Sequence, residues 1–152
     1  MTIQDQKTTP KRGLGDFLCF AVYSANLAFG RVYKPVLDQV GLTYPQYITI
    51  VALWEEDNQT VSSLGEKLFL ESNTLTPMLK KLEAMGYVRR QRSAADERQV
   101  VVSLTDAGRR AREKIASTSL VKATGLNAED FRAMQRGVVA LRNNLMAATK
   151  SQ

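Results

Sequence analysis

The sequence has no histidine and only one cysteine among its 152 residues. The absence of histidine excludes His-based general acid–base catalysis, Ser-His-Asp and Cys-His nucleophile pairs, and every metal site with an imidazole ligand. The lone cysteine, Cys19, excludes a disulfide within the chain and a zinc site built from four thiolates of one chain. An unpaired thiol is typical of the reducing cytosol, so we expect a cytoplasmic protein.

Long hydrophobic runs are absent too. The longest, at residues 50–54, is far shorter than the ~20 residues that span a bilayer, and the mostly polar residues 1–15 do not resemble a signal peptide. We therefore expect no membrane partner. The length suits one domain, or a core with an appended module. A net charge of +6 favours an anionic partner without identifying it.

Helical periodicity dominates the chain after an N-terminal arm at residues 1–13 that we expect to be flexible. The expected helices run from Leu14 to a kink or end at Pro35, from Thr43 to about Glu56, from Ser63 to about Leu70, from Ser72 to Gly86, from Thr105 to about Thr124, and from Asn127 onward. Thr43, Ser63, Ser72, Thr105 and Asn127 are the predicted N-terminal caps. Residues 59–61 are compatible with a brief strand.

The pattern becomes β-rich after Gly86. Residues 87–92 and 98–104 favour strands, and the polar segment between them predicts a hairpin. A helix-turn-helix followed by a hairpin is a winged helix. We therefore predict a mainly α fold with a small β-wing, flanked by long N- and C-terminal helices.

The fourth predicted helix carries the two kinds of side chain that a DNA-binding helix needs, one for bases and one for phosphates. If Leu75 points inward, the opposite face carries short polar side chains near the start, which can approach base edges, and lysines farther along, which can reach phosphates. The candidate DNA-binding residues of this helix are Ser72, Asn73, Thr74, Thr76, Lys80 and Lys81.

The hairpin adds the candidates Arg89, Arg90, Arg92 and Arg98. Residues 72–98 hold six basic and three acidic side chains, so their net charge of +3 is half that of the chain. Arg98 follows the turn, where a wing tip can enter an electronegative minor groove, and Asp96 can hold its guanidinium in place. The alternative is a solvated, charged face with a local ion pair.

Several segments resemble a known family. The second half of the predicted winged helix resembles the core of MarR-family repressors. The residues that carry this resemblance are Leu75-Thr-Pro-Met-Leu-Lys-Lys-Leu-Glu83, Gly86, Asp96-Glu-Arg98 and Ser103-Leu-Thr105. The N-terminal half resembles the OhrR-type branch of this family, which senses organic hydroperoxides. The matching segments are Leu18-Cys-Phe-Ala-Val-Tyr23, Tyr33-Lys-Pro35 and Leu42-Thr-Tyr-Pro-Gln-Tyr47. The resemblance covers about residues 14–115.

This resemblance implies a homodimer, a pseudo-palindromic operator in double-stranded DNA and repression in the reduced state. Residues 14–152 would form a single unit, with a DNA-binding core at 58–105 and interleaved dimerisation helices at 14–56 and 106–150. Cys19 would sense the peroxide, and Tyr23, Tyr33 and Tyr44 would line its pocket. We accordingly expect no enzymatic activity and no cofactor.

The positions of the sensor residues along the first predicted helix decide which of them can meet within one chain. Cys19 and Tyr23 are four residues apart and share a helix face, whereas Tyr33 lies ~21 Å farther along a continuous helix. Tyr33 cannot touch Cys19 of its own chain, but an antiparallel partner helix could bring the two together. Tyrosine hydroxyls can stabilise a thiolate, and the apolar residues Phe17, Phe20 and Val22 would favour organic over hydrogen peroxide. We hypothesise that sulfenic acid formation shifts the dimer and releases the operator.

The chain lacks the second, resolving cysteine of some members of this branch, and Ser119 stands near its expected position. Oxidised Cys19 would then take a small external thiol, cyclise onto a backbone nitrogen or oxidise further. Three other functions remain open. They are a regulator controlled by a small aromatic ligand, with a structural Cys19; a thiol peroxidase, which would turn over; and an architectural DNA binder, which would show no operator preference.

Overall fold

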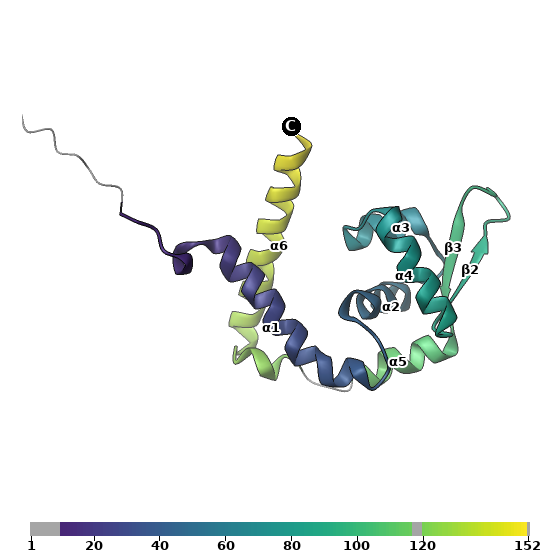
Figure 1. Ribbon diagram of the computed structural model, residues 1–152, viewed down its shortest axis with the longest axis horizontal. Coiled ribbons are helices and arrows are strands. Elements are labelled where there is room, and N and C mark those ends of the chain that lie inside the picture. The colour runs from purple at the N-terminus through teal and green to yellow at the C-terminus, as the bar shows by residue number, and fades with distance from the viewer. Residues whose placement is uncertain (1–9, 117–119, 152) are drawn as a thin grey trace, which may run out of the picture.

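The computed structural model describes residues 10–116 and 120–151 (Figure 1). The short 3-10 helix Leu14–Asp16 precedes the long helix α1, Leu18–Asp38. The winged helix then follows as α2 (Tyr44–Glu55), β1 (Gln59–Thr60), α3 (Val61–Leu68), α4 (Ser72–Ala84), β2 (Val88–Arg92) and β3 (Val100–Leu104). The chain continues through α5 (Asp106–Ala116), a 3-10 turn at Lys122–Thr124 and the last helix, α6 (Ala128–Lys150).

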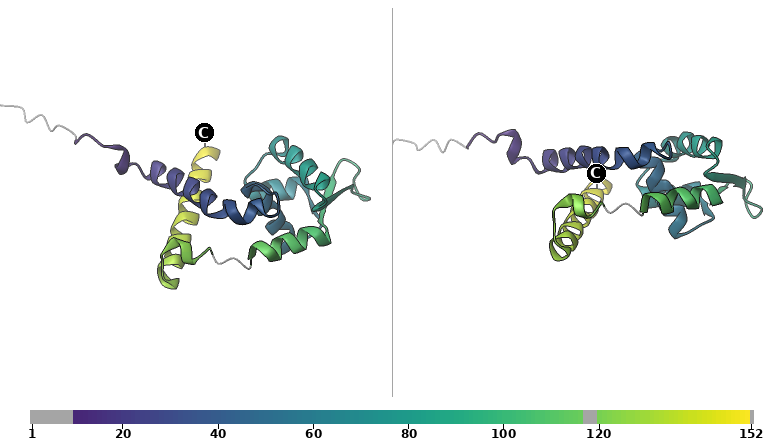
Figure 2. Two further views of the ribbon diagram at one scale, coloured as in Figure 1. Left: turned by 60° about the horizontal axis from the view of Figure 1, so that its bottom comes forward. Right: turned by 90° about the horizontal axis from the view of Figure 1, so that it is seen from below.

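The molecule has two visibly different parts. Helices α2–α5 and the hairpin form a compact body around the C-terminal end of α1, while the rest of α1 and all of α6 extend away from it (Figure 1). Figure 2 shows the same separation from two further directions, with the hairpin at the far end of the compact body. The predicted mainly α fold with a β-wing is confirmed.

The wing is a three-stranded antiparallel sheet of order β1-β3-β2. Val88 pairs with Leu104 at one end of the hairpin and Arg92 pairs with Val100 at the other. The brief strand β1 pairs Gln59 with Val102 and joins the hairpin to the helix-turn-helix.

The core lies where α2, α3, α4 and α5 meet the sheet. The predicted inward stripe of α4 is confirmed, because Leu75, Leu79 and Leu82 are fully buried. Each such side chain stabilises the fold by about 1.5–3 kcal/mol relative to an exposed one. The other large, fully buried apolar side chains are Ile50, Leu53, Leu64, Val102 and Ile115.

The first helix differs from its prediction at both ends. It begins at Leu18 rather than Leu14, because Asp16 accepts a hydrogen bond from the Gly13 amide and closes a separate 3-10 turn. Of the two outcomes predicted at Pro35, an end or a kink, the end is wrong, because the helix continues to Asp38. Burial of Val36 and Leu37, the next two residues, compensates for the backbone hydrogen bond that proline cannot make.

Two predicted caps are wrong. Thr60, not Ser63, caps α3, because its hydroxyl accepts the Ser63 amide at 3.1 Å. Ser72 lies inside α4 as its first residue, after the N-cap Glu71, whose side chain makes no capping bond. The other predicted caps are confirmed, since Thr43 and Asn127 accept amides at the starts of α2 and α6 and Thr105 accepts the Gly108 amide at 3.2 Å.

The fifth helix is shorter than predicted. It ends at Ala116 instead of near Thr124, and residues 122–124 form a 3-10 turn closed by Gly125 in the left-handed conformation. Ser119, the residue near the expected resolving cysteine, lies outside the described residues. No helix in the described part of the chain is both long and apolar enough to cross a membrane.

Candidate functional site

Helix α4 presents a polar face away from the core. Its three buried leucines fix its rotation, and the side chains at Ser72, Asn73, Thr74, Lys80 and Lys81 are exposed as a result, while Thr76 is half-buried. The predicted candidates of this helix therefore lie on its accessible side. Such an arrangement suits a helix that enters the major groove of DNA.

The wing tip holds the predicted Asp96–Arg98 pair. Both the backbone amide and Nε of Arg98 donate to Asp96 Oδ1, at 3.1 and 3.2 Å, and the Asp96 amide donates to Ser93 Oγ. The Arg98 side chain is 91% exposed, whereas that of Asp96 is only 36% exposed. The aspartate thus anchors the base of an arginine whose charge projects into solvent.

Arg90 differs from the other wing arginines. Its amide donates to Glu83 Oε2 at 2.9 Å, and its Nη2 donates to Glu83 Oε1 at 3.1 Å. The backbone amide and then the guanidinium of Arg90 hold the pKa of Glu83 below its usual range. The structure therefore uses Arg90 to fix the wing to α4, while Arg89 and Arg92 remain exposed.

A second junction, which sequence analysis missed, fixes the base of the wing. Asp57 Oδ2 accepts Arg109 Nη2 at 2.7 Å, and Asp57 Oδ1 accepts the Leu104 amide at 2.8 Å. The adjacent Asn58 has a left-handed backbone, with φ of 56°, and accepts the Ser103 hydroxyl. An Asp-Asn pair is typical of a turn, but the side chains that these two residues bind are 45 to 52 residues away in the sequence.

The four predicted sensor residues fall into two groups. Cys19 is exposed in the first turn of α1, and Tyr23, one turn later, is 59% exposed. Tyr33 lies near the other end of this continuous helix, ~21 Å along its axis from Cys19. Its ring contacts that of Tyr44, with 5.0 Å between the centroids. One chain thus brings together Tyr33 and Tyr44, but not the thiol.

Tyr47 completes the group around Tyr33, with 6.0 Å between the ring centroids, and was not predicted. Burial raises the pKa of Tyr33, as do the neighbouring Tyr44 and Tyr47, and burial likewise raises the pKa of Tyr44. These phenols are therefore protonated at neutral pH and can donate hydrogen bonds. We call Tyr33, Tyr44 and Tyr47 the tyrosine cluster.

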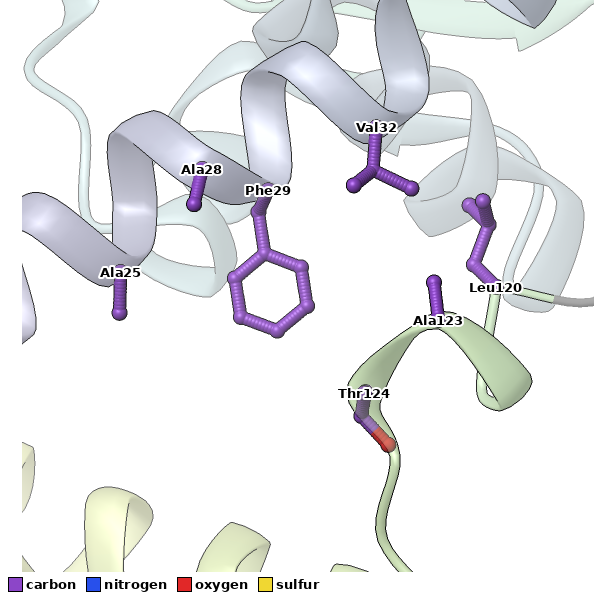
Figure 3. A pocket seen from close by; sticks show the side chains of 7 residues that line it. All are labelled: Ala25, Ala28, Phe29, Val32, Leu120, Ala123 and Thr124. Carbon is purple, nitrogen blue, oxygen red and sulfur yellow. The ribbon is translucent and has the colours of Figure 1, made fainter.

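An apolar groove of about 1070 Å³ lies between α1 and α6. Leu18, Val22 and Phe29 line it from α1, and Met134 and Val138 line it from α6. A smaller hollow of about 310 Å³ continues it toward Leu120 and Ala123; Figure 3 shows the ring of Phe29 turned into this space. No residue of α6 is buried in the single chain.

One contact links α6 to the helix-turn-helix. The guanidinium carbon of Arg142 lies 4.4 Å from the ring centroid of Phe69, in the turn between α3 and α4. Phe69 has a left-handed backbone with φ of 58°, which is rare for a bulky residue, and its side chain is half-exposed. Nothing in the sequence pattern indicated this pairing.

Comparison with known proteins places this architecture. A family model described as transcriptional regulator SarA/Rot matches residues 31–115. The HTH-type transcriptional regulator TtmR of Methylorubrum extorquens is 44% identical over 142 residues, covering 92% of this chain and 73% of that protein. The organic hydroperoxide resistance transcriptional regulator of Bacillus subtilis is 47% identical over 97 residues, covering 64% of this chain and 66% of the relative.

Solved structures agree. AbfR of Staphylococcus epidermidis, in its reduced form bound to DNA, is 37% identical with a TM-score of 0.73, and covers 88% of this chain and 94% of its own. Overoxidized AbfR bound to DNA is 38% identical, with a TM-score of 0.70 and coverages of 86% and 93%. Together with the winged helix built above, these matches show that the chain belongs to the MarR/SarZ-type winged-helix family of DNA-binding transcriptional regulators, not to a family of enzymes.

Proposed function

We propose that this protein is a homodimeric repressor that binds a pseudo-palindromic operator when reduced and releases it when an organic hydroperoxide oxidises Cys19. The observation that carries this proposal is the separation of the sensor residues. An exposed thiol lies at one end of α1 and a pair of packed phenols at the other. An antiparallel second copy of α1 would bring each thiol to the phenols of the other chain.

The dimer is supported by the unburied apolar surface of α1 and α6. Leu18, Phe29, Met134 and Leu145 are each between 48% and 64% exposed in the single chain. Exposed apolar surface of this extent marks an interface. We assign residues 14–56 and 106–150 to dimerisation and residues 58–105 to DNA binding.

Contact with DNA is assigned to α4 and the wing. Two copies of α4 in a dimer would enter successive major grooves, ~34 Å apart, and the wing arginines would flank them. Arg98 is the best-placed side chain for a minor groove, because Asp96 anchors it and its charge projects outward. Lys80 and Lys81 would bind phosphates.

The sensing step is attack of the Cys19 thiolate on the terminal peroxide oxygen. An S–O bond forms, the O–O bond breaks, and the leaving alkoxide takes a proton to become an alcohol. The product is a sulfenic acid. Protonated phenols such as Tyr33 and Tyr44 would donate hydrogen bonds to the thiolate and so raise the fraction in the attacking form. Oxidation removes that anion, and the phenols lose their acceptor.

Release of DNA depends on which product the oxidised Cys19 forms. This chain has one cysteine, so a disulfide requires a thiol from another molecule. When a small thiol attacks the sulfenic sulfur, an S–S bond forms, the S–O bond breaks and water leaves. Overoxidized AbfR is found bound to DNA, so not every oxidised form of that relative releases it. We propose that the mixed disulfide with a small thiol, which is bulkier than a sulfenic acid, opens the interface most.

The test is an operator titration at fixed salt, with a duplex selected from a random pool by the reduced protein. Its arms are reduced protein, protein treated with an organic hydroperoxide, and protein treated with hydroperoxide plus a small thiol, with the state of Cys19 read by mass spectrometry. We expect release to follow Cys19 oxidation and to be absent in Cys19→Ser. Release of Cys19→Ser by peroxide would overturn the proposal. Release only by an aromatic carboxylate would favour a ligand-controlled regulator.

A further inference from the structure

The phenol of Tyr87 has no part in the mechanism above. Tyr87 lies half-buried between α4 and β2, and its hydroxyl donates a hydrogen bond to the carbonyl oxygen of Val40 at 2.7 Å. Val40 belongs to the turn of residues 39–43, which joins α1 to α2. Tyr87 and Val40 are 47 residues apart in the sequence, so this bond is a tertiary contact between two distant segments.

The turn at residues 39–43 is attached to the tyrosine cluster. Tyr44 follows the turn as the first residue of α2, and Tyr33, near the C-terminal end of α1, contacts it. The turn itself is tightly held, because Leu42 is buried and its amide donates to the Leu37 carbonyl at 3.1 Å. A displacement of the phenols would therefore move this turn with them.

The backbone of Tyr87 is bonded to the DNA-reading surface of α4 and the wing. Its amide donates to the Leu82 carbonyl near the end of α4 at 3.0 Å, and its carbonyl accepts the Thr105 amide, which follows β3, at 3.1 Å. Helix α5 packs so closely on the Tyr87 carbonyl that there is no room for a side chain at Gly108. Tyr87 is thus fixed to α4, the wing and α5 at once.

An apolar contact joins the same turn to the end of α4. The terminal methyl of Met85, the C-terminal cap of α4, lies 3.5 Å from the position that a Cβ atom at Gly41 would occupy. Gly41 is the neighbour of Val40 in the turn, and its φ of 70° is left-handed. The turn therefore meets the end of α4 through a hydrogen bond and a packing contact.

We propose that Tyr87 is a positioning residue that couples the sensor to DNA binding, because it holds the turn at residues 39–43 and the DNA-reading surface together as one body. This inference rests on the proposed function, in which oxidation of Cys19 displaces the tyrosine cluster. The ion pairs that fix the wing contain no residue of α1 or of this turn. Without the Tyr87 hydroxyl, the turn would move while α4 and the wing stay on the DNA.

The experiment compares wild type with Tyr87→Phe, which keeps the ring and removes only the hydroxyl. Operator affinity is measured at fixed salt for the reduced form and for the mixed disulfide of Cys19 with a small thiol. We expect the reduced forms to agree within about twofold, and the ratio of oxidised to reduced dissociation constants to be about fivefold smaller in Tyr87→Phe, as one net hydrogen bond allows. Ser103→Ala removes a hydroxyl bonded to Asn58 at the base of the wing and should keep the wild-type ratio.

A second measurement separates coupling from a merely structural role. In thiol–disulfide exchange, the Cys19 thiolate attacks a small disulfide, an S–S bond to Cys19 forms and one small thiolate leaves. Coupling is reciprocal, so operator DNA should oppose this exchange by the same factor by which the modification weakens DNA binding. Tyr87→Phe should reduce this effect of DNA about fivefold and leave the exchange equilibrium of the free protein unchanged.

The outcomes separate this inference from the proposed function. If Tyr87→Phe keeps both wild-type ratios, its hydroxyl does not couple the two regions, and the inference is wrong while the sensor stands. If hydroperoxide releases the operator from Cys19→Ser, the proposed function fails and the inference fails with it. Met85→Ala, which removes the packing contact with the turn, is the second variant should Tyr87→Phe not fold. A wild-type ratio in Met85→Ala would then overturn the inference.

Discussion

The winged-helix body and the terminal helices contain similar apolar side chains, yet one buries them and the other does not. Leu75, Leu79 and Leu82 of α4 are fully buried, whereas Met134 and Leu145 of α6 are 58% and 59% exposed. The apolar stripes of the two helices have the same helical periodicity. The difference is that α4 finds its partners within the chain and α6 does not.

This contrast indicates that the DNA-binding surface forms within one chain, whereas the sensor needs two chains. The DNA-reading surface is held by contacts within one chain, such as Glu83–Arg90 and Asp57–Arg109. The sensor residues lie at opposite ends of α1 and need a second chain to meet. Arg142 on Phe69 is a contact by which α6 touches the helix-turn-helix. Substitutions in the two regions should therefore fail in different ways.

The largest effect on stability is expected in the body. Leu79→Ala leaves a cavity at a fully buried position of α4 and should lower the free energy of unfolding by about 2–5 kcal/mol. Urea denaturation at fixed protein concentration measures this loss. The neighbouring exposed change Lys80→Ala should stay within about 0.5 kcal/mol of the wild type. Equal losses in both variants would contradict the burial described for α4.

The terminal helices should respond through association instead. Val138→Glu places a charge in the groove between α1 and α6, so we expect dissociation to monomers with retained helix content and at least a tenfold loss of operator affinity. Sedimentation velocity and circular dichroism provide the measurements. Arg132→Glu, on the side of α6 away from the groove, is the matched control. A Val138→Glu dimer as tight as the wild type would show that this groove is not the interface.

A smaller effect is expected at the wing tip. Arg98→Ala should weaken operator binding by about 1–2 kcal/mol and reduce the slope of log affinity against log salt by about one. The dimer and the fold should be unaffected, because the Arg98 side chain is 91% exposed. Asp96→Ala should show a weaker version of the same defect. Lys34→Ala on α1 is the control, and an identical salt slope in Arg98→Ala would remove Arg98 from the DNA contacts.

The smallest effect concerns the junction between the wing and α4. Since Arg90 holds the pKa of Glu83 below its usual range, the Glu83–Arg90 contact stabilises the fold above the ordinary glutamate pKa. That stability is lost as the pH falls through the folded pKa. The difference in unfolding free energy between wild type and Glu83→Gln should therefore be larger at pH ~7 than at pH ~3. A difference independent of pH would mean that the charge of Glu83 contributes nothing.

Sequence periodicity predicted the winged-helix body well because the interactions that form its helices and hairpin join residues close together in the sequence. The α4 stripe, the hairpin and the Thr43 cap each depend on residues a few positions apart, and the structure confirms them. The predicted helix boundaries were wrong where a competing local contact or burial in the core determined where the helix begins or ends. Asp16 closed a separate turn before α1, and burial of Val36 and Leu37 carried α1 past Pro35.

The site was less accessible to sequence reasoning because its contacts cross long stretches of chain. Tyr33 and Tyr44 were singled out by resemblance, but their ring contact and the addition of Tyr47 come from the packing of α1 on α2. The sequence pattern likewise gave no sign that the guanidinium of Arg112 packs on the ring of Trp54, because these two residues belong to different helices. The assignment of Cys19 and the tyrosines to one pocket stays a prediction.

A mixed dimer tests most directly whether the sensor is shared between chains. One chain carries Tyr33→Phe with Tyr44→Phe and keeps Cys19; the other carries Cys19→Ser and keeps its tyrosines. If the pocket forms across the interface, the single thiol of this heterodimer meets intact phenols, and we predict that an organic hydroperoxide oxidises it at the wild-type rate. Oxidation at the slow rate of the tyrosine-substituted homodimer would place the pocket within one chain and contradict the account.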